Sequence, residues 1–500
     1  MGYSNFTKPF AVVRNALWGV PPSDPKERRY LLKLDIFVLS YVCLMYWVNY
    51  LDRANVSNAY VSGMKQDLNM GGDDFNLVNT IFYIGYIISM VPHNMILLKV
   101  RPRYWLTICA AIWSILTLAT YKVTHFYQLC VIRFFQAMFE SCIFGGVHLI
   151  LGSYYTNKKD LIIRSFVFTS SGLVGQIFSG VIQAAVHKTM NGWHGLASWR
   201  VLFIMDFICS FPIVIYGFIF FPDAPDVGKP FYFTEEEHQM ALAKMTKPKY
   251  DKFNTDLIRR IFGRWHWYLF SMLWIVGAIN ESFATNSIFA LWLNHYNYSV
   301  EDRNHFPMGV FAVGVLATAL SAYYIRYVGN GKSHWHVSLA IAAVMVISPV
   351  IQLCKPFDKT AVFVAQYLSG VSYAAQTVSF SWANVVCAND LQERAIVISS
   401  MNMLGNCMNA WWSITFFGAK TAPRFRNGAI ALISSAAATL FVVGLIAWLQ
   451  MREDKRRGGI VDTFDAVEAA ESGEDSTCGG GDSLAEFDEK KLASLPRVEY

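Results

Sequence analysis

The sequence predicts an all-α membrane protein with twelve transmembrane helices. Of its 500 residues, 54% are hydrophobic and only 16% are charged, whereas about a quarter of a typical soluble domain is charged. The mean hydropathy is +0.31, and the apolar residues gather in long runs such as residues 429–449. A run of about 18 apolar residues is long enough to cross a bilayer as a helix. The composition therefore argues against a soluble enzyme, a nucleic-acid-binding protein and a secreted disulfide-rich domain.

The apolar segments fall into two groups of six, separated by a polar linker whose Pro222 and Pro225 end the sixth helix sharply. We expect spans near residues 31–60, 76–98, 104–121, 126–154, 161–187, 197–221, 265–293, 306–328, 335–353, 361–387, 394–418 and 427–450. The domain plan is a cytoplasmic segment at 1–30, a six-helix bundle at 31–221, a cytoplasmic linker at 222–264, a second six-helix bundle at 265–450 and a tail at 451–500. This arrangement is typical of two-half transporters.

The basic residues predict the orientation of the chain. With a cytoplasmic N-terminus, the cytoplasmic segments carry 27 Lys and Arg residues and the outside loops carry 10, in agreement with the positive-inside rule. Both termini are then cytoplasmic. The last fifty residues hold 13 acidic and 7 basic residues, which predicts a disordered, solvated tail or a trafficking or degradation signal. Asn297, in an Asn-Tyr-Ser sequence of a predicted outside loop, is a candidate glycosylation site.

Catalytic and metal-binding motifs are missing from the sequence. The nine cysteines include no CxxC pair and lie mostly in apolar segments, so we expect neither a zinc site nor a disulfide framework. There is no GxSxG or HExxH motif, and Gly331-Lys332-Ser333 lacks the upstream glycine of a phosphate-binding loop. We therefore expect no cofactor and no enzyme activity.

The first predicted span carries adjacent opposite charges. Asp52 and Arg53 point about 100° apart on a helix, and Asn55 and Asn58 add polar groups at helical spacing. Ionisable groups inside a bilayer cost free energy unless they are paired or hydrated, so each is a functional candidate. The alternative is that the helix ends at Leu51 and the charges lie in an outside loop.

The fourth predicted span carries two more charges. Arg133 and Glu140 are seven residues apart and share one helix face at a separation of about 10 Å. Because that is too far for an ion pair within the helix, each needs a partner on another helix, and Asp52 and Arg53 are the obvious partners. Such a tetrad would be neutral, and protonation of one acid would free an arginine to bind an anion. The alternative is a structural ion network that holds the two helices together.

Two further acids are more ambiguous. Asp206 lies near a span end, where a capping or interfacial role is expected, and Glu281 could either face a cavity or join a structural network. Gly172, Gly175 and Gly180 predict close helix contacts in the fifth span.

Several motifs resemble the anion:cation symporter group of the major facilitator superfamily. They are the first-span sequence Asp52-Arg53-Ala54-Asn55, the Trp199-Arg200 pair at the start of span six and the Pro-Asp-x-Pro run at 222–225. Closer similarity to the fungal allantoate-permease branch, and within it to the pantothenate (vitamin B5) permeases, is carried by residues 133–142, 152–155, 264–267, 289–293, 381–384, 391–397 and 409–414. The resemblance covers residues 31–450.

The resemblance implies roles for individual residues. Asp52 and Glu140 would carry protons, Arg133 would engage Asp52, and Arg53 would hold a substrate carboxylate. Further substrate contacts are implied at Tyr50, Gln176, Ser379, Ser381, Trp382 and Asn402.

The expected function is proton-coupled uptake of a small organic carboxylate. Pantothenate is the first substrate that the resemblance implies, and biotin, nicotinate and allantoate are alternatives. The partners would be this substrate, H+ and the lipid bilayer, with no nucleic acid, and we expect a monomer in a fungal plasma membrane. A nutrient sensor that keeps the transporter fold without transporting is a further alternative, although such a protein would typically lose its proton-binding acids.

Overall fold

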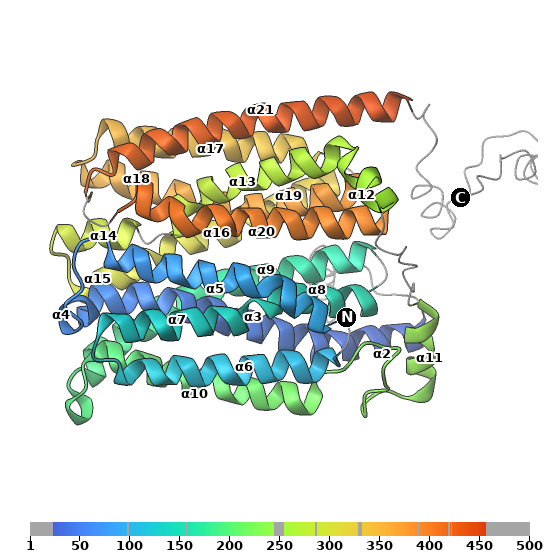
Figure 1. The fold of residues 1–500 in the computed structure, drawn as a ribbon, viewed down its shortest axis with the longest axis horizontal. Helices are drawn as coiled ribbons and strands as arrows, with labels where there is room; N and C mark the ends of the chain where they lie inside the picture. Colours follow the sequence, from blue (N-terminus) through green and yellow to red (C-terminus); the bar gives the residue numbers. More distant parts are fainter. Residues whose placement is uncertain are drawn as a thin grey trace, which may run out of the picture. The chain divides into compact units, whose positions relative to one another are not determined.

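The computed structural model describes residues 24–97, 100–155, 158–244, 255–285, 288–328, 333–387, 390–418, 421 and 423–456. Every regular element among these residues is a helix (Figure 1), which confirms the predicted all-α class. The chain divides into two units, Met1–Ile446 and Ala447–Tyr500, and the first holds all of the described helices except the end of the last one. Most of the predicted acidic tail lies outside the described residues.

The helices of the predicted N-terminal half follow the expected spans closely. They are α2 (Pro25–Leu34), η1 (Asp35–Leu39), α3 (Ser40–Ala59), η2 (Tyr60–Met64), α4 (Lys65–Asp67), α5 (Asp74–Leu97), α6 (Pro102–Ala119), η3 (Thr120–Lys122), α7 (Phe126–Glu140), α8 (Cys142–Tyr154), α9 (Lys158–Met190), η4 (Trp193–Gly195) and α10 (Ser198–Phe220). The span expected at 126–154 is divided into α7 and α8 at Ser141.

The linker and the predicted C-terminal half are helical as well. The linker contains α11 (Glu235–Lys244) and α12 (Thr255–Phe262). The half itself contains α13 (Trp265–Thr285), α14 (Ile288–His295), α15 (Val300–His305), α16 (Met308–Tyr323), η5 (Tyr324–Val328), α17 (His334–Cys354), α18 (Lys359–Ser369), η6 (Gly370–Ser372), α19 (Tyr373–Val386), α20 (Leu391–Phe416) and α21 (Arg426–Arg456). Helix occupies each of the twelve predicted ranges, and among the described residues eight helical stretches are long and apolar enough to cross a membrane. The number of twelve spans stays a prediction.

The first span begins earlier and runs further than its apolar residues alone suggest. Its helix starts at Pro25, where the Asp24 side chain accepts a hydrogen bond from the backbone N–H of Lys26 at 2.9 Å. Proline is favoured in the first helical turn because it needs no backbone donor there. The helix continues through Ala59, so it does not end at Leu51, and the charged pair lies inside it.

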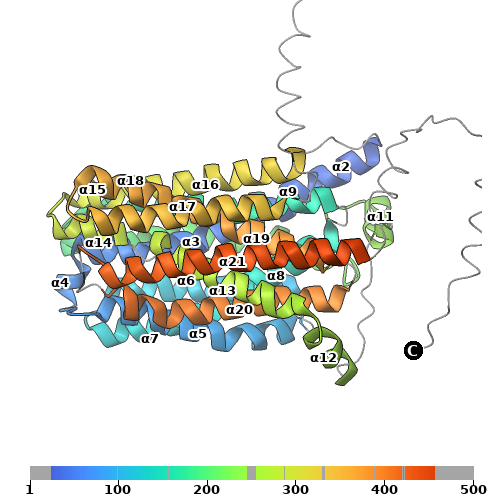
Figure 2. The same cartoon turned by 90° about the horizontal axis from the view of Figure 1, so that it is seen from above.

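The helices pack in a pattern that repeats between the two predicted halves. In the first half α3 packs on α9, and in the second α13 packs on α20. The halves meet where α5 packs on α20 and where α16 packs on α9. Figures 1 and 2 show these helices running side by side with roughly parallel axes. Related helices thus occupy related places, as expected of a transporter built from two similar bundles.

Large apolar side chains cover the outward faces of several helices. Leu316 and Leu320 on α16 are 64% and 68% exposed, and Phe441 on α21 is 71% exposed. Exposed apolar surface on this scale is a liability in water but is the normal surface of a helix in lipid.

Glycines allow the first and fifth spans to approach closely, as predicted. A Cβ atom at Gly175 would overlap the carbonyl oxygen of Trp47, and one at Gly172 would lie 2.9 Å from ring carbons of Tyr46 and Tyr50. Small residues permit such contacts between helices in membranes. The resulting packing holds α3, which carries Asp52 and Arg53, firmly against α9.

Hydrogen bonds join the two predicted halves at the end where α4, α14 and α15 lie (Figure 1). Arg303 Nη1 donates to the carbonyl of Val61 at 3.0 Å, and Asn304 Nδ2 donates to Ser62 Oγ at 3.2 Å. Asn76 Nδ2 also donates across the halves, to the carbonyl of Phe417 at 3.3 Å. These contacts join the two halves at the end that the basic residues predict to face outside.

Candidate transport site

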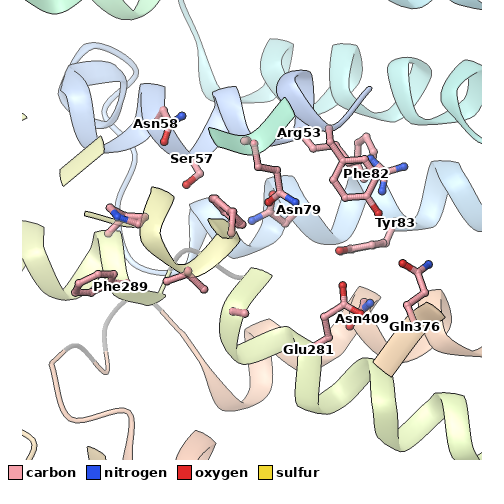
Figure 3. Close-up of a pocket in the computed structure, with 18 of the residues that line it drawn as sticks. Arg53, Ser57, Asn58, Asn79, Phe82, Tyr83, Glu281, Phe289, Gln376 and Asn409 are labelled. Atoms are coloured by element: carbon pink, nitrogen blue, oxygen red, sulfur yellow. The ribbon is translucent and has the colours of Figure 1, made fainter. Parts of the chain in front are cut away.

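A cavity lies between helices of the two predicted halves. Most of its lining residues come from α3, α5, α7 and α9 on one side and from α13, α16, α19 and α20 on the other. The cavity volume that water can occupy is about 170 Å³. Its charged wall residues are Arg53, Arg133 and Glu281, and it is rich in side-chain amides, among them Asn58, Asn79, Gln176, Gln376, Asn402, Asn406 and Asn409. Figure 3 shows Arg53 and Asn79 facing Glu281, Asn409 and Gln376 across the cavity.

Arg53 is the cation that reaches this cavity from α3. Its Nε atom lies 3.1 Å from Oε2 of Glu140, whose side chain is fully buried, whereas 23% of the Arg53 side chain is exposed. The rings of Tyr50, Phe82 and Tyr86 lie 5.0 to 5.3 Å from the guanidinium carbon, where cation–π attraction stabilises the charge. Arg53 is therefore held by an acid and aromatic rings while part of it faces the cavity.

Arg133 on α7 is more deeply buried and is linked to Asp52 through two side chains. Its Nη1 donates to Gln136 Oε1 at 3.0 Å, and Gln136 Nε2 donates to Thr117 Oγ1 at 2.9 Å. The Thr117 hydroxyl donates to Asp52 Oδ2 at 2.7 Å. Within the described part of the chain, no ion pair joins Arg133 and Asp52 directly.

The four charges predicted to form a tetrad thus lie in one region, but only one of the two expected pairs is in direct contact. Arg53 and Glu140 form the expected ion pair, whereas a chain of hydrogen bonds links Arg133 to Asp52. The difference follows from the helix geometry, because adjacent residues point about 100° apart. Arg53 faces α7 and the cavity, and Asp52 faces α6.

Known proteins share this architecture. A profile of the Major Facilitator Superfamily matches residues 42–413. The chain belongs to this superfamily. It is 49% identical over 438 residues to the pantothenate transporter FEN2 of Saccharomyces cerevisiae, covering 86% of this chain and 85% of that protein. It is 36% identical over 441 residues to the pantothenate transporter liz1 of Schizosaccharomyces pombe, covering 88% and 85%.

Solved structures agree with this assignment at the level of the fold. The proton:xylose symporter XylE aligns with a TM-score of 0.61 at 12% identity, over 83% of this chain and 95% of that one. A bacterial homologue of the lysosomal transporter Spinster aligns with a TM-score of 0.56 at 14% identity, over 85% and 96%. The chain is a multi-pass membrane transporter and not an enzyme, and its predicted resemblance to fungal pantothenate permeases is confirmed.

The remaining predicted contacts of this transporter fall into two groups. Tyr50, Gln176 and Asn402 line the cavity with Arg53 and Arg133. On α19, by contrast, Ser379, Ser381 and Trp382 are not among the lining residues. Ser381 donates to the carbonyl of Val378 on its own helix at 3.0 Å, and the buried Trp382 ring packs against Phe270 at 5.8 Å between ring centroids. Gln376, about one turn before Ser379, supplies the contact of this helix with the cavity.

Asp206 on α10 belongs to the charged region, although its position near a span end predicted a capping role. Its carboxyl group interacts electrostatically with that of Asp52, and both residues are 1% exposed. Asn55 Nδ2 donates to Asp206 Oδ2 at 2.5 Å, and Ser179 Oγ donates to Asn55 Oδ1 at 2.5 Å. Two buried carboxylates that lie close together repel each other, so this pair is a candidate second site for a proton. In the sequence, Asn55 indicated a polar contact inside the first span, but nothing there identified Asp206 as its hydrogen-bond partner.

In the described part of the chain, two clusters have side chains of the types that bind metal ions, but protein groups already engage them. In the first, His93, Cys109 and Cys142, the His93 Nδ1 accepts from Trp105 Nε1 at 3.0 Å and its Nε2 contacts the carbonyl of Met138 at 2.9 Å. In the second, His266, Cys387 and Glu393, the Glu393 carboxylate pairs with Arg264 and with His266. Both clusters therefore fit a structural role in helix packing.

Asn297, the candidate glycosylation site, is exposed between α14 and α15. Its φ of 54° is a left-handed conformation that asparagine tolerates better than most residues. The sequon therefore lies in an accessible turn.

Proposed function

We propose that this transporter is a proton-coupled symporter that imports pantothenate by alternating access. The two relatives at 49% and 36% identity, both named pantothenate transporters, support the substrate. The observation that carries the mechanism is the ion pair between Arg53 and Glu140 at the cavity wall. We place the protein in the plasma membrane as a monomer, with both termini in the cytoplasm and with two six-helix halves at 31–221 and 265–450.

The ion pair supplies a way to couple a proton to an anion. In the empty site Glu140 neutralises Arg53, so the guanidinium is only weakly available to a substrate. Protonation of Glu140 removes that competition, and the substrate carboxylate takes its place through charge-assisted hydrogen bonds from Arg53. The loaded site is again neutral, which lowers the cost of closing it within the membrane.

Asp52 extends this coupling to a second acid. It accepts from Thr117 and contacts Asp206, and the hydrogen-bond chain through Gln136 connects it to Arg133. A proton gained or lost at the Asp52 and Asp206 pair changes the charge that balances Arg133. Binding at the cavity and protonation behind it are thereby linked through α6 and α7.

Alternating access needs contacts from both halves. Asn402 and Gln376 provide amide groups from the second half for the amide of pantothenate, and Arg53 provides the cation from the first. The hydrogen bonds of Arg303 and Asn304 to η2 join the halves at the end that would face outside. In the proposed cycle they break when the site opens to the outside.

Biotin is the best-supported alternative substrate. A protein named vitamin H transporter from Saccharomyces cerevisiae is 26% identical to this chain over 450 residues, and biotin also carries a carboxylate for Arg53. Identity to the pantothenate transporters is considerably higher, which favours pantothenate.

Uptake of labelled pantothenate by cells that express Arg53 variants tests the proposal. Each hydrogen bond to a charged partner contributes about 1.5–3 kcal/mol, so Arg53→Ala should lower uptake at least about tenfold at equal surface amounts. Arg53→Lys, which keeps the charge but loses the planar fork, should retain part of the uptake. Uptake by Arg53→Ala at the wild-type level would exclude this role for the residue.

A further inference from the structure

Glu281 on α13 is an acidic residue that has no role in the proposed proton coupling. It lines the main cavity and also a small neighbouring pocket with Tyr373 and Gln376. Among the described residues, no hydrogen bond or ion pair engages its carboxylate. By contrast, the neighbouring Asn280 is fixed by donating to Thr439 Oγ1 at 2.9 Å. Glu281 is therefore free to bind something that enters the cavity.

The position of Glu281 places an acidic side chain and a basic side chain on opposite walls of the cavity. Figure 3 shows its carboxylate pointing into the cavity from the second half, across from Arg53 of the first half. Tyr50 and Tyr83 line the same cavity as Arg53 and Glu281. A molecule that spans this cavity therefore meets a guanidinium group at one end and the oxygens of a carboxyl group at the other.

We infer that Glu281 binds the hydroxyl end of the substrate, which spans the cavity with its carboxylate on Arg53. This inference rests on the proposed function and adds the orientation of the substrate to it. Pantothenate has its carboxylate at one end and two hydroxyl groups at the other, with an amide between them. Its hydroxyls can donate to the oxygens of the Glu281 carboxyl group, which has no hydrogen-bond partner among the described residues.

The same contact explains how the site would select among carboxylates. A monocarboxylate without hydrogen-bond donors at its far end, such as nicotinate, would separate Glu281 from water without replacing the lost hydrogen bonds. Sites that hydrogen-bond a substrate hydroxyl discriminate strongly against analogues that lack it. Glu281 is thus a specificity-determining residue.

Competition by two molecules tests the inference. Uptake of labelled pantothenate is measured against unlabelled pantothenate and against an N-acyl-β-alanine of similar size without hydroxyl groups. In the wild type, we expect pantothenate to compete about tenfold better or more. In Glu281→Ala that preference should collapse, because affinity for pantothenate falls while affinity for the analogue changes little. Glu281→Gln, which keeps one acceptor oxygen, should lie between them.

The control variant is Glu301→Gln on α15, which also removes one carboxylate from the second half but lies outside the cavity lining; it should keep the wild-type preference. An equal loss of affinity for both competitors in Glu281→Ala, or an unchanged preference, would overturn the inference and leave the proposed function standing. If Glu281→Ala does not reach the cell surface, the preference measured in Glu281→Gln decides in the same way. A wild type that transports no pantothenate would overturn both.

Discussion

Replacement of Glu140 by Gln should uncouple pantothenate binding from pH. The wild-type pair joins Nε of Arg53 to Oε2 of Glu140 at 3.1 Å, with the acid fully buried and 23% of the arginine side chain exposed. Hydrogen bonds to charged partners contribute about 1.5–3 kcal/mol. Because Arg53 reaches the water of the cavity and glutamine keeps an acceptor oxygen, we expect the lower end of this range, which corresponds to about tenfold in affinity.

Binding of labelled pantothenate to the purified protein at about pH 5.5 and about pH 7.5 measures this effect. In the wild type, acid should strengthen binding, because protonation of Glu140 frees Arg53. Glu140→Gln should bind about tenfold more tightly than the wild type at the higher pH, with nearly equal affinity at both values. In cells it should lose proton-driven accumulation but keep exchange. A variant with the wild-type pH dependence, or with weaker binding at both values, would refute the reasoning. Glu301→Gln should behave like the wild type.

Three further substitutions have defined outcomes. Asp206→Asn should reduce proton-driven accumulation while exchange of internal for external substrate persists; full accumulation would make this residue a structural partner only. Gly175→Ala should lower the free energy of unfolding by about 1–3 kcal/mol, because its Cβ would overlap the first span. The control Gly444→Ala, whose Cβ would have no atom within 4 Å, should leave the melting temperature unchanged. Equal melting temperatures for the two variants would contradict the packing. Burial alone would raise the pKa of Glu237, but its ion pair with Lys33 and its hydrogen bonds with Thr234 together outweigh burial and hold that pKa below the usual 4.5. The stability that this pair contributes should be complete above pH 4.5 and should be lost as the pH falls below that value. The melting temperatures of the wild type and Glu237→Gln should therefore converge in acid. A melting-temperature difference that does not depend on pH would contradict this role of the pair.

The apolar pattern was sufficient to predict where the helices lie, but not their ends. Helix occupies each expected range because a chain in lipid must satisfy its backbone groups internally. The start of the first helix at Pro25 depends on the Asp24 cap, a local polar feature that a search for apolar runs does not use. The division of the span at 126–154 has no comparable signal in its hydropathy.

The charged residues predicted the composition of the site but not its connections. The pair of Arg53 and Glu140 could be expected because few ions of opposite sign are available inside the spans. The partner of Asp52 could not, since it depends on the rotation of α3 and α10 about their axes, which brings Asp206 against it. On α19 the polar run around Ser381 was visible in the sequence, but the rotation of the helix presents Gln376 to the cavity instead.

Transport by the purified protein in lipid vesicles tests the central claim most directly. Labelled pantothenate is added outside vesicles at acidic external and neutral internal pH, with and without a protonophore, and biotin is measured in parallel. A proton-coupled pantothenate symporter should accumulate pantothenate above its external concentration, and the protonophore should abolish that accumulation. Entry that only equilibrates, at the same rate with and without the gradient, would contradict proton coupling. Accumulation of biotin without pantothenate would contradict the substrate.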